Sequence, residues 1–200
     1  MKNGKFLGLL CFVFAIVTFA FGPKAETFAI TPDDSTVNWT GYKVTGKHTG
    51  TIGVKAGALI FKDDMLEGGE FEIDMSSITC TDLEGESATK LVGHLSSEDF
   101  FGVEKHPTAT FKITRAVPYG EEGKYKIIGD MNIKDKKQEL KFLADVNVVN
   151  SKVTASAKVE IDRTDFDVRY GSGSFFDNLG DKTIYDEFEL VLDLKGTKMK

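Results

Sequence analysis

The stretch Gly69-Glu70-Phe71-Glu72-Ile73-Asp74-Met75 decides the fold, because apolar residues occupy its odd positions from 71 onward and acidic residues fill the positions between them. A period of two with one charged face indicates a half-buried strand of an antiparallel sheet. The same alternation recurs along the chain, at 37–39, 52–58, 109–113, 125–133, 140–148, 153–161 and 188–194. We therefore predict about eight antiparallel strands that turn one apolar face toward a common interior.

Turn-forming residues separate these segments, at Asp63-Asp64, Gly68-Gly69, 120–123, 134–137 and Asn150-Ser151. Many short strands with a shared apolar face predict a barrel or a sandwich. A closed barrel leaves no unpaired strand edge and needs no disulfide to do so. The expected fold is therefore all-β, a closed antiparallel barrel of about eight strands.

One segment departs from the period of two. Ala88, Leu91, Val92 and Leu95 stand at i, i+3, i+4 and i+7, which predicts a short helical insertion near residues 82–96. Because Phe100-Phe101 follow directly, we expect the insertion to lie over one mouth of the barrel. It is either a functional lid or a plain plug that completes the core.

The first 25 residues have the three parts of a secretory signal: lysines at 2 and 5, an apolar stretch from 6 to 21, and small residues at the exit. We predict a signal peptide over 1–25, a single barrel domain over 26–200, and a periplasmic or secreted location. An uncleaved membrane anchor is the alternative. After cleavage Cys80 is the only cysteine left, so the domain has no internal disulfide.

Charge and motif content exclude several classes of function. The 25 Lys+Arg and 31 Asp+Glu give a net charge of −6 without any basic stripe, so we expect no nucleic-acid partner. The three histidines lie far apart and lack the short spacings of a metal site. No nucleophile elbow or glycine-rich phosphate loop occurs. We expect neither an enzyme nor a cofactor.

The inward face mixes phenylalanines with several alanines, among them Ala155 and Ala157. An eight-stranded barrel is either just filled by its side chains or left open for one small ligand. An open apolar space without polar anchors suits a hydrocarbon chain. The pattern alone leaves both a cavity and a solid core open. The long connection at 161–181 mixes aromatic, glycine, arginine and aspartate residues, and loops of this length tend to be functional.

Several motifs together resemble the YceI-like family of exported, lipocalin-like, polyisoprenoid-binding bacterial proteins. They are Ser35-Thr36-Val37-Asn38-Trp39, the pattern L-x-S-x-D-F-F within 94–101, the stretch Pro107-Thr108-Ala109-Thr110-Phe111, and 129–134. The stretch 170–180 looks like the branch common in Bacteroidetes. The chain departs from the family pattern at Asp34, where many members carry histidine, and at Asp135-Lys136, where a glycine-containing turn is usual.

The resemblance implies a lipocalin-like barrel that carries or sequesters an amphiphilic isoprenoid lipid, such as a polyprenyl phosphate or a quinone, in its interior. The partner is then this or another long-chain lipid, with transient membrane contact. Phe100, Phe101 and the 163–176 loop would gate the mouth, and Arg163 and Tyr170 would contact the head group. The expected tunnel lining is Trp39, Phe61, Phe71, Ile73, Phe111, Ile113, Ala155 and Ala157. The alternative is an exported, stress-related protein-interaction module with a solid core and no ligand.

Overall fold

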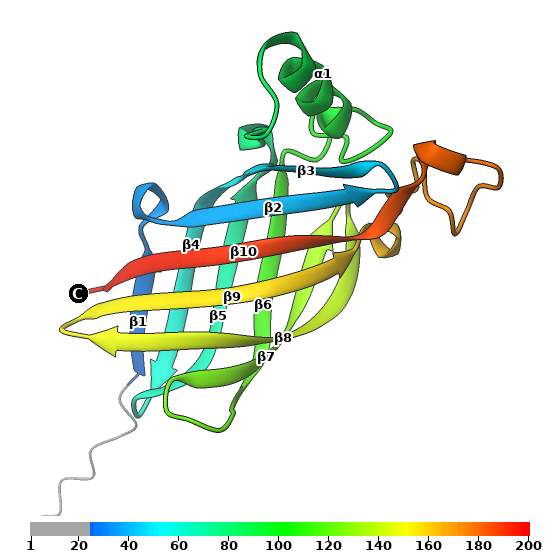
Figure 1. Cartoon of the computed structure of the whole chain (residues 1–200). Helices are drawn as coiled ribbons and strands as arrows, with labels where there is room; N and C mark the ends of the chain where they lie inside the picture. Colours follow the sequence, from blue (N-terminus) through cyan, green and yellow to red (C-terminus); the bar gives the residue numbers. More distant parts are fainter. Residues whose placement is uncertain (1–24) are drawn as a thin grey trace, which may run out of the picture.

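The structure is a computed structural model that describes residues 25–200, so the predicted signal peptide lies outside the described residues except for Ala25. Ten strands and one α-helix make up the described part (Figure 1). The strands are β1 (Ala25–Ile30), β2 (Thr36–Lys43), β3 (Gly46–Thr51), β4 (Gly53–Lys62), β5 (Met65–Asp74), β6 (Thr108–Pro118), β7 (Lys124–Ile133), β8 (Lys136–Val149), β9 (Lys152–Asp162) and β10 (Ile184–Lys198).

Eight of these strands close into a barrel. The order β1-β4-β5-β6-β7-β8-β9-β10 is antiparallel throughout, and β10 returns to β1 through pairs such as Phe28 with Lys198 and Ile30 with Gly196. Farther along β10, β2 pairs with residues 184–193 and carries β3 on its other edge. In Figure 1 the near wall of β2, β10, β9 and β8 crosses the far wall of β4, β5 and β6 obliquely. The predicted closed barrel is confirmed.

Strands β1 and β3 were not predicted, so the eight expected strands are not the eight that form the ring. The ring includes β1, a short strand that follows the predicted leader. β3 has the sequence GKHTGT, which contains no apolar alternation to mark it as a strand. It is held instead by backbone pairing to β2. The alternation of apolar and polar residues therefore identifies strands with a core-facing side. It misses a polar strand that forms only by pairing with its neighbour.

Three predicted turns are tight two-residue hairpins in which both central residues have positive φ. Asp63 and Asp64 join β4 to β5, Lys134-Asp135 joins β7 to β8, and Asn150-Ser151 joins β8 to β9. This geometry matches the right-handed twist of the strands. The turn predicted at Gly68-Gly69 is wrong, because both glycines lie inside β5.

A β-bulge in β4 changes which residues face inward. The register with β5 shifts between Val54 and Ala56, so that Lys55 and Ala56 are both exposed and Leu59 is buried. A bulge adds one residue and so reverses the alternation beyond it. The expected inward alternation through 52–58 is therefore wrong from residue 56 onward.

The predicted helical insertion is confirmed as α1 (Gly85–Ser96), which begins three residues later than expected. Figure 1 shows it above the barrel, next to the end of β3. The chain before it runs along β3, where the Thr79 and Thr81 amides donate to the carbonyls of Thr51 and Thr49 at 2.9 and 2.8 Å. No helix in residues 25–200 is long and apolar enough to cross a membrane.

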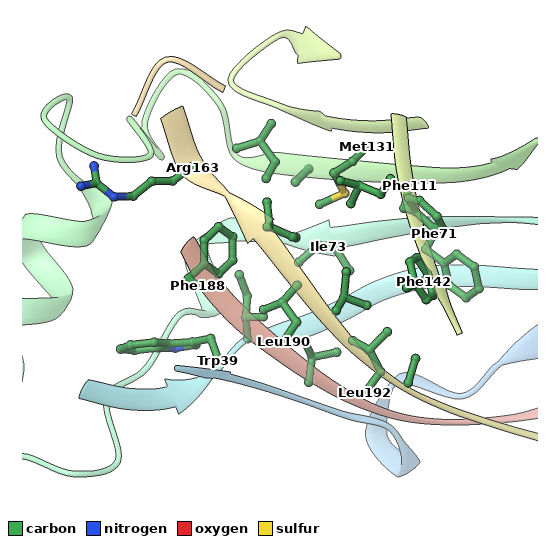
Figure 2. Close-up of a pocket in the computed structure, with 18 of the residues that line it drawn as sticks. Trp39, Phe71, Ile73, Phe111, Met131, Phe142, Arg163, Phe188, Leu190 and Leu192 are labelled. Carbon is green, nitrogen blue, oxygen red and sulfur yellow. The ribbon is translucent and has the colours of Figure 1, made fainter. Parts of the chain in front are cut away.

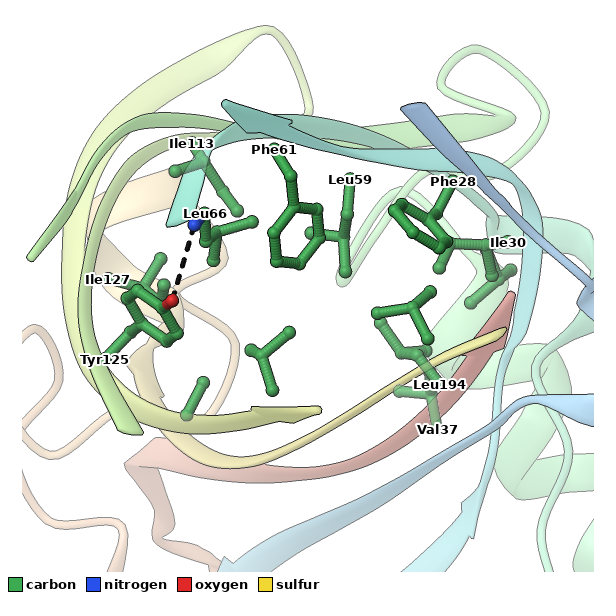
Figure 3. Close-up of a cluster of buried hydrophobic side chains, with 14 residues drawn as sticks. Phe28, Ile30, Val37, Leu59, Phe61, Leu66, Ile113, Tyr125, Ile127 and Leu194 are labelled. Carbon is green, nitrogen blue, oxygen red and sulfur yellow. Dashed lines mark hydrogen bonds between the residues drawn. The ribbon is translucent and has the colours of Figure 1, made fainter. Parts of the chain in front are cut away.

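Opposite α1, the interior is filled by buried side chains that we call the packed end. They are Phe28, Phe61 and Tyr125 (Figure 3), together with Val153 of the same hydrophobic cluster. All four are buried, with Phe28 and Val153 only 1% exposed. The rings of Phe28 and Phe61 meet edge to face with centroids 5.3 Å apart. The Leu66 amide donates to the Tyr125 hydroxyl at 3.3 Å, so the one polar group there is satisfied.

Candidate ligand-binding cavity

A cavity of about 250 Å³ occupies the barrel between α1 and the packed end, and its wall is almost entirely apolar. Many side chains on this wall face the interior yet are only partly buried, unlike those of the packed end. They include Ile52, Phe71, Ile73, Phe111, Phe142, Leu190 and Leu192. Interior residues that remain partly accessible indicate that the barrel is hollow at this level.

Three phenylalanines form a ladder along one side of the wall (Figure 2). Phe71 and Phe111 are a direct cross-strand pair with stacked rings 6.5 Å apart, and the ring of Phe142 lies 5.5 Å from that of Phe111. Gly129 on β7 makes room for this ladder, because a Cβ there would come within 2.5 Å of the Phe111 ring. The ladder gives the cavity a flat aromatic side.

Small residues line the adjoining part of the wall, on β8 beyond Phe142 and on β9. Ala144 pairs directly with Ala157, and Ala155 pairs with Val146, and all four border the cavity. A solid barrel would place large side chains opposite small ones so that they interdigitate. Ala144 and Ala157 are side-by-side neighbours on the same face and leave a shallow recess in the wall. Together with the cavity of about 250 Å³, this recess favours the hollow interior over the solid core.

Trp39 on β2 closes the cavity toward β3. Its indole Nε1 donates to the Thr79 carbonyl at 3.0 Å, and the side chain is 8% exposed. Gly50, its partner on β3, allows this arrangement, because a Cβ would lie 1.8 Å from the Thr79 oxygen and 2.6 Å from the indole. The wall at this point is therefore fixed by the segment that leads to α1.

That segment, residues 79–82, is anchored by Asp82. The Asp82 carboxylate accepts from the Thr49 amide at 2.8 Å and lies 2.8 Å from His48 Nδ1. Burial by itself raises the pKa of Asp82, but hydrogen bonds from Thr49, His48 and Cys80 outweigh it and lower the pKa to about 2. We call residues 79–82 the strap, since they tie the start of α1 to β3.

The mouth is closed by α1 and by an aromatic cluster. Leu91 and Leu95 of α1 border the cavity together with Phe100 and Phe101. The ring of Phe101 lies 6.4 Å from that of Phe188 on β10. On the outer side, His94 sits between Phe100 and Tyr170, with ring centroids 4.9 and 4.5 Å away. Aromatic contacts rather than a continuous backbone ladder therefore cover this end.

Arg163, the first residue after β9, is 4% exposed, and its guanidinium is hydrogen-bonded to protein atoms. Nε donates to the Tyr185 carbonyl at 3.1 Å, Nη1 to that of Val168 at 2.7 Å, and Nη2 to that of Ile184 at 3.0 Å and to Asp186 at 3.4 Å. Burial lowers its pKa, which nearby Asp186 and Asp162 oppose. In Figure 2 the guanidinium points away from the phenylalanine ladder.

Most of the predicted site residues border the cavity. They are Trp39, Phe71, Ile73, Phe100, Phe101, Phe111, Ile113, Ala155, Ala157 and Arg163. Phe61 does not, because it packs against Phe28 at the packed end. Tyr170 lies on the outer side of the mouth against His94. A head-group contact by Arg163 would require it to release its carbonyl partners, and this role stays a prediction.

Other lining residues were absent from the predicted site: Leu91, Leu95, Met131, Leu140, Phe142, Phe188, Leu190 and Leu192. The two leucines belong to the helical stripe, and most of the others share the inward alternation of their strands. That signal was present in the sequence. In the part of the chain that the structure describes, no three His, Cys, Asp or Glu side chains are placed to hold a metal ion.

The fold and the cavity define a closed antiparallel β-barrel with a hollow, apolar interior. The family model of the YceI-like domain matches residues 28–196, and the chain belongs to this family. No curated protein sequence matches the chain. Its placement in the branch common in Bacteroidetes stays a prediction.

Solved structures share the fold. The chain is similar to BcnA of Burkholderia cenocepacia, with a TM-score of 0.65 and 22% identity over 84% of this chain and 99% of that one. It is also similar to a polyisoprenoid-binding domain from Saccharophagus degradans that is implicated in plant cell wall breakdown. The TM-score is 0.63 and the identity 11%, over 86% of this chain and 98% of that one. The YceI protein of Campylobacter jejuni gives a TM-score of 0.53 and 18% identity, over 68% of this chain and 75% of that one.

Proposed function

We propose that this protein is an exported, non-enzymatic carrier that binds or sequesters an amphiphilic isoprenoid lipid, with the hydrocarbon tail in the barrel and the head group at the mouth beneath α1. The observation that carries the proposal is the hollow apolar interior. An apolar cavity of about 150 Å³ stays dry and takes up benzene. This larger cavity therefore favours hydrocarbon over water.

The energetics favour a long tail. Burying hydrocarbon contributes about 25 cal/mol per Å², and association and ordering costs offset part of that gain. The wall offers few polar groups to orient a sugar or a nucleotide. The recess between Ala144 and Ala157 would accommodate the methyl branches of an isoprenoid. The polyisoprenoid-binding domain from Saccharophagus degradans, which shares the fold, supports this class of ligand.

Trp39 provides a direct test, because it is the only tryptophan of the chain and borders the cavity. A benzoquinone with a short isoprenoid tail should quench its fluorescence saturably. Ala157→Phe places a ring in the recess and should weaken this binding at least about tenfold, since the ring occupies the volume of the tail. Ala56→Phe adds the same ring on the exposed face of β4 and should leave binding unchanged.

The same pair of variants tests the alternative function, a protein-interaction module with a solid core and no ligand. In a solid core Ala157→Phe would cost about 1–3 kcal/mol of stability, and the quinone would not quench Trp39 in any form of the protein. Mass spectrometry of a solvent extract of the protein, purified from its native envelope, should recover an isoprenoid lipid. Repeated recovery of no lipid would contradict the carrier function.

A further inference from the structure

Five large apolar side chains around the mouth are exposed to solvent, and we call them the aromatic rim. Val44, Tyr170, Phe175, Phe176 and Tyr185 are between 45% and 51% exposed. Scattered exposed apolar residues are normal on a protein surface, but a group that includes four aromatic rings marks an interaction site. They come from the β2–β3 turn, the connection after β9 and the start of β10, which project together at one end of the barrel (Figure 1).

Backbone hydrogen bonds hold the rim in place. The Val44 amide donates to the Thr183 carbonyl at 3.1 Å, and the Ile184 amide donates to that of Gly171 at 2.8 Å. The amides of Phe175 and Phe176 both donate to the carbonyl of Ser172, a fully buried residue. These hydrogen bonds give the connection a defined structure, so the rim side chains are exposed because of the fold.

The rim is continuous with the entrance of the cavity. Tyr185 itself borders the cavity. The ring of Tyr170 lies 5.5 Å from that of Phe100, which borders the cavity from the inside. A surface that meets the rim would therefore also meet the mouth.

We propose that the aromatic rim inserts into the interfacial layer of a lipid bilayer and sets the mouth of the barrel against the membrane. This inference rests on the proposed function, and it names the surface through which the lipid enters and leaves. Aromatic side chains favour the boundary between head groups and acyl chains, and affinity there grows with the apolar area buried. The Arg169 guanidinium lies 4.4 Å from the centre of the Phe175 ring. We expect its charged end to stay at the level of the head groups while the ring inserts, because a long charged side chain keeps its charge in the polar layer.

The charges near the rim identify the kind of bilayer. The connection carries Asp165, Asp167, Asp177 and Asp181 against Arg169 and Lys182, Lys43 and Lys47 flank Val44 in the β2–β3 hairpin, and Arg163 is buried, so the charges near the rim nearly balance. The whole chain has a net charge of −6. Anionic lipids would therefore not attract the rim, in contrast to proteins that use a polybasic patch. Insertion into a zwitterionic surface should depend little on salt.

The experiment uses phosphatidylcholine vesicles that carry a benzoquinone with a long isoprenoid tail, and follows quenching of Trp39. In the wild type the uptake rate should rise with vesicle concentration, and the protein should float with the vesicles. Phe175→Ser combined with Phe176→Ser should lower the rate at least about tenfold. Tyr119→Ser, a 55% exposed residue in the β6–β7 turn beside the packed end, is the control and should leave the rate unchanged.

A short-tail quinone supplied from water separates the two proposals. All three proteins should bind it equally, since none of the substituted residues, Phe175, Phe176 and Tyr119, borders the cavity. If they do, but the double variant extracts the long-tail quinone from vesicles as fast as the wild type, the rim is not a membrane surface and serves another partner, such as a protein. A wild-type rate independent of vesicle concentration would overturn the inference too. No binding of the short-tail quinone by any protein would instead overturn the proposed function, and the inference with it.

Discussion

The two ends of the barrel are built from the same strands and differ in how their interiors are filled. At the packed end β10 pairs with β1, which contributes Phe28, and the large side chains there are buried against each other. Toward the mouth β10 pairs with β2, which contributes Trp39. There the inward side chains leave a cavity of about 250 Å³.

This difference separates the source of stability from the site of binding. Close packing yields dispersion and hydrophobic stabilisation that a void forfeits. We therefore expect substitutions at the packed end to lower the free energy of unfolding without changing ligand affinity. Substitutions on the cavity wall should do the reverse. Each prediction below tests whether the two ends are independent in this sense.

The largest expected effect is that of Phe28→Ala at the packed end. Phe28 is 1% exposed and its ring contacts Phe61, so truncation should lower the free energy of unfolding by about 3–5 kcal/mol. Urea unfolding followed by circular dichroism measures this loss. Phe71→Ala is the matched control on the cavity wall, and it should cost less than half as much while weakening quinone binding. Equal losses of stability for the two variants would mean that the wall is packed as tightly as the other end.

Arg163→Met comes next, because it leaves several carbonyls without their donor at the mouth. We expect a loss of about 3 kcal/mol and faster proteolysis of the connection at 167–183, which Arg163 ties to β10. Arg169→Met, at an exposed side chain of the same connection, should change stability by less than about 0.5 kcal/mol. A loss of lipid affinity at unchanged stability would instead assign Arg163 to the head group.

Much of the fold could be predicted from the sequence because alternation reports directly on a half-buried strand. Phe71 and Ile73 were assigned to the interior in this way, and Leu91 and Leu95 to a helix face. The bulge after Val54 could not be predicted, since it depends on pairing with β5 rather than on local composition. β3 was missed for the same reason.

The site was harder to predict because alternation gives the face of a residue and not its depth along the barrel. Phe61 points inward as expected, but it lies at the level of the packed end. Arg163 shows the same limit for polar groups, because two of its carbonyl partners lie 21 and 22 residues away on β10. Only the folded chain reveals that they lie within hydrogen-bond distance of its guanidinium.

Tyr125→Phe should have a moderate effect confined to the packed end. The change removes the hydroxyl that accepts the Leu66 amide and leaves a buried N–H group without a partner, which costs about 1–2 kcal/mol. Urea unfolding measures the loss, and quinone affinity should be unchanged. Tyr119→Phe removes an exposed hydroxyl and should have no effect. Weaker quinone binding in Tyr125→Phe would show that the packed end influences the cavity.

Asp82→Asn should have the smallest effect, and the size of this effect depends on pH. The pKa of Asp82 is about 2 in the folded protein, against about 3.9 for an unperturbed aspartate. The ionised carboxylate therefore stabilises the fold above about pH 4, and this contribution disappears as the pH falls through 2. Because the carboxylate is partly exposed, we expect less than about 1 kcal/mol between wild type and Asp82→Asn at neutral pH.

Urea unfolding of both proteins from pH 7 to pH 2 tests this expectation, with Asp33→Asn, in the exposed turn after β1, as the control. The difference between wild type and Asp82→Asn should persist down to about pH 4 and should vanish toward pH 2. Hydrogen exchange of the Thr49 amide, which donates to Asp82, should accelerate in the variant, while that of the Leu66 amide at the packed end should not. Equal acceleration at both amides would show that the strap and the packed end unfold as one unit, and the two ends would then not be independent.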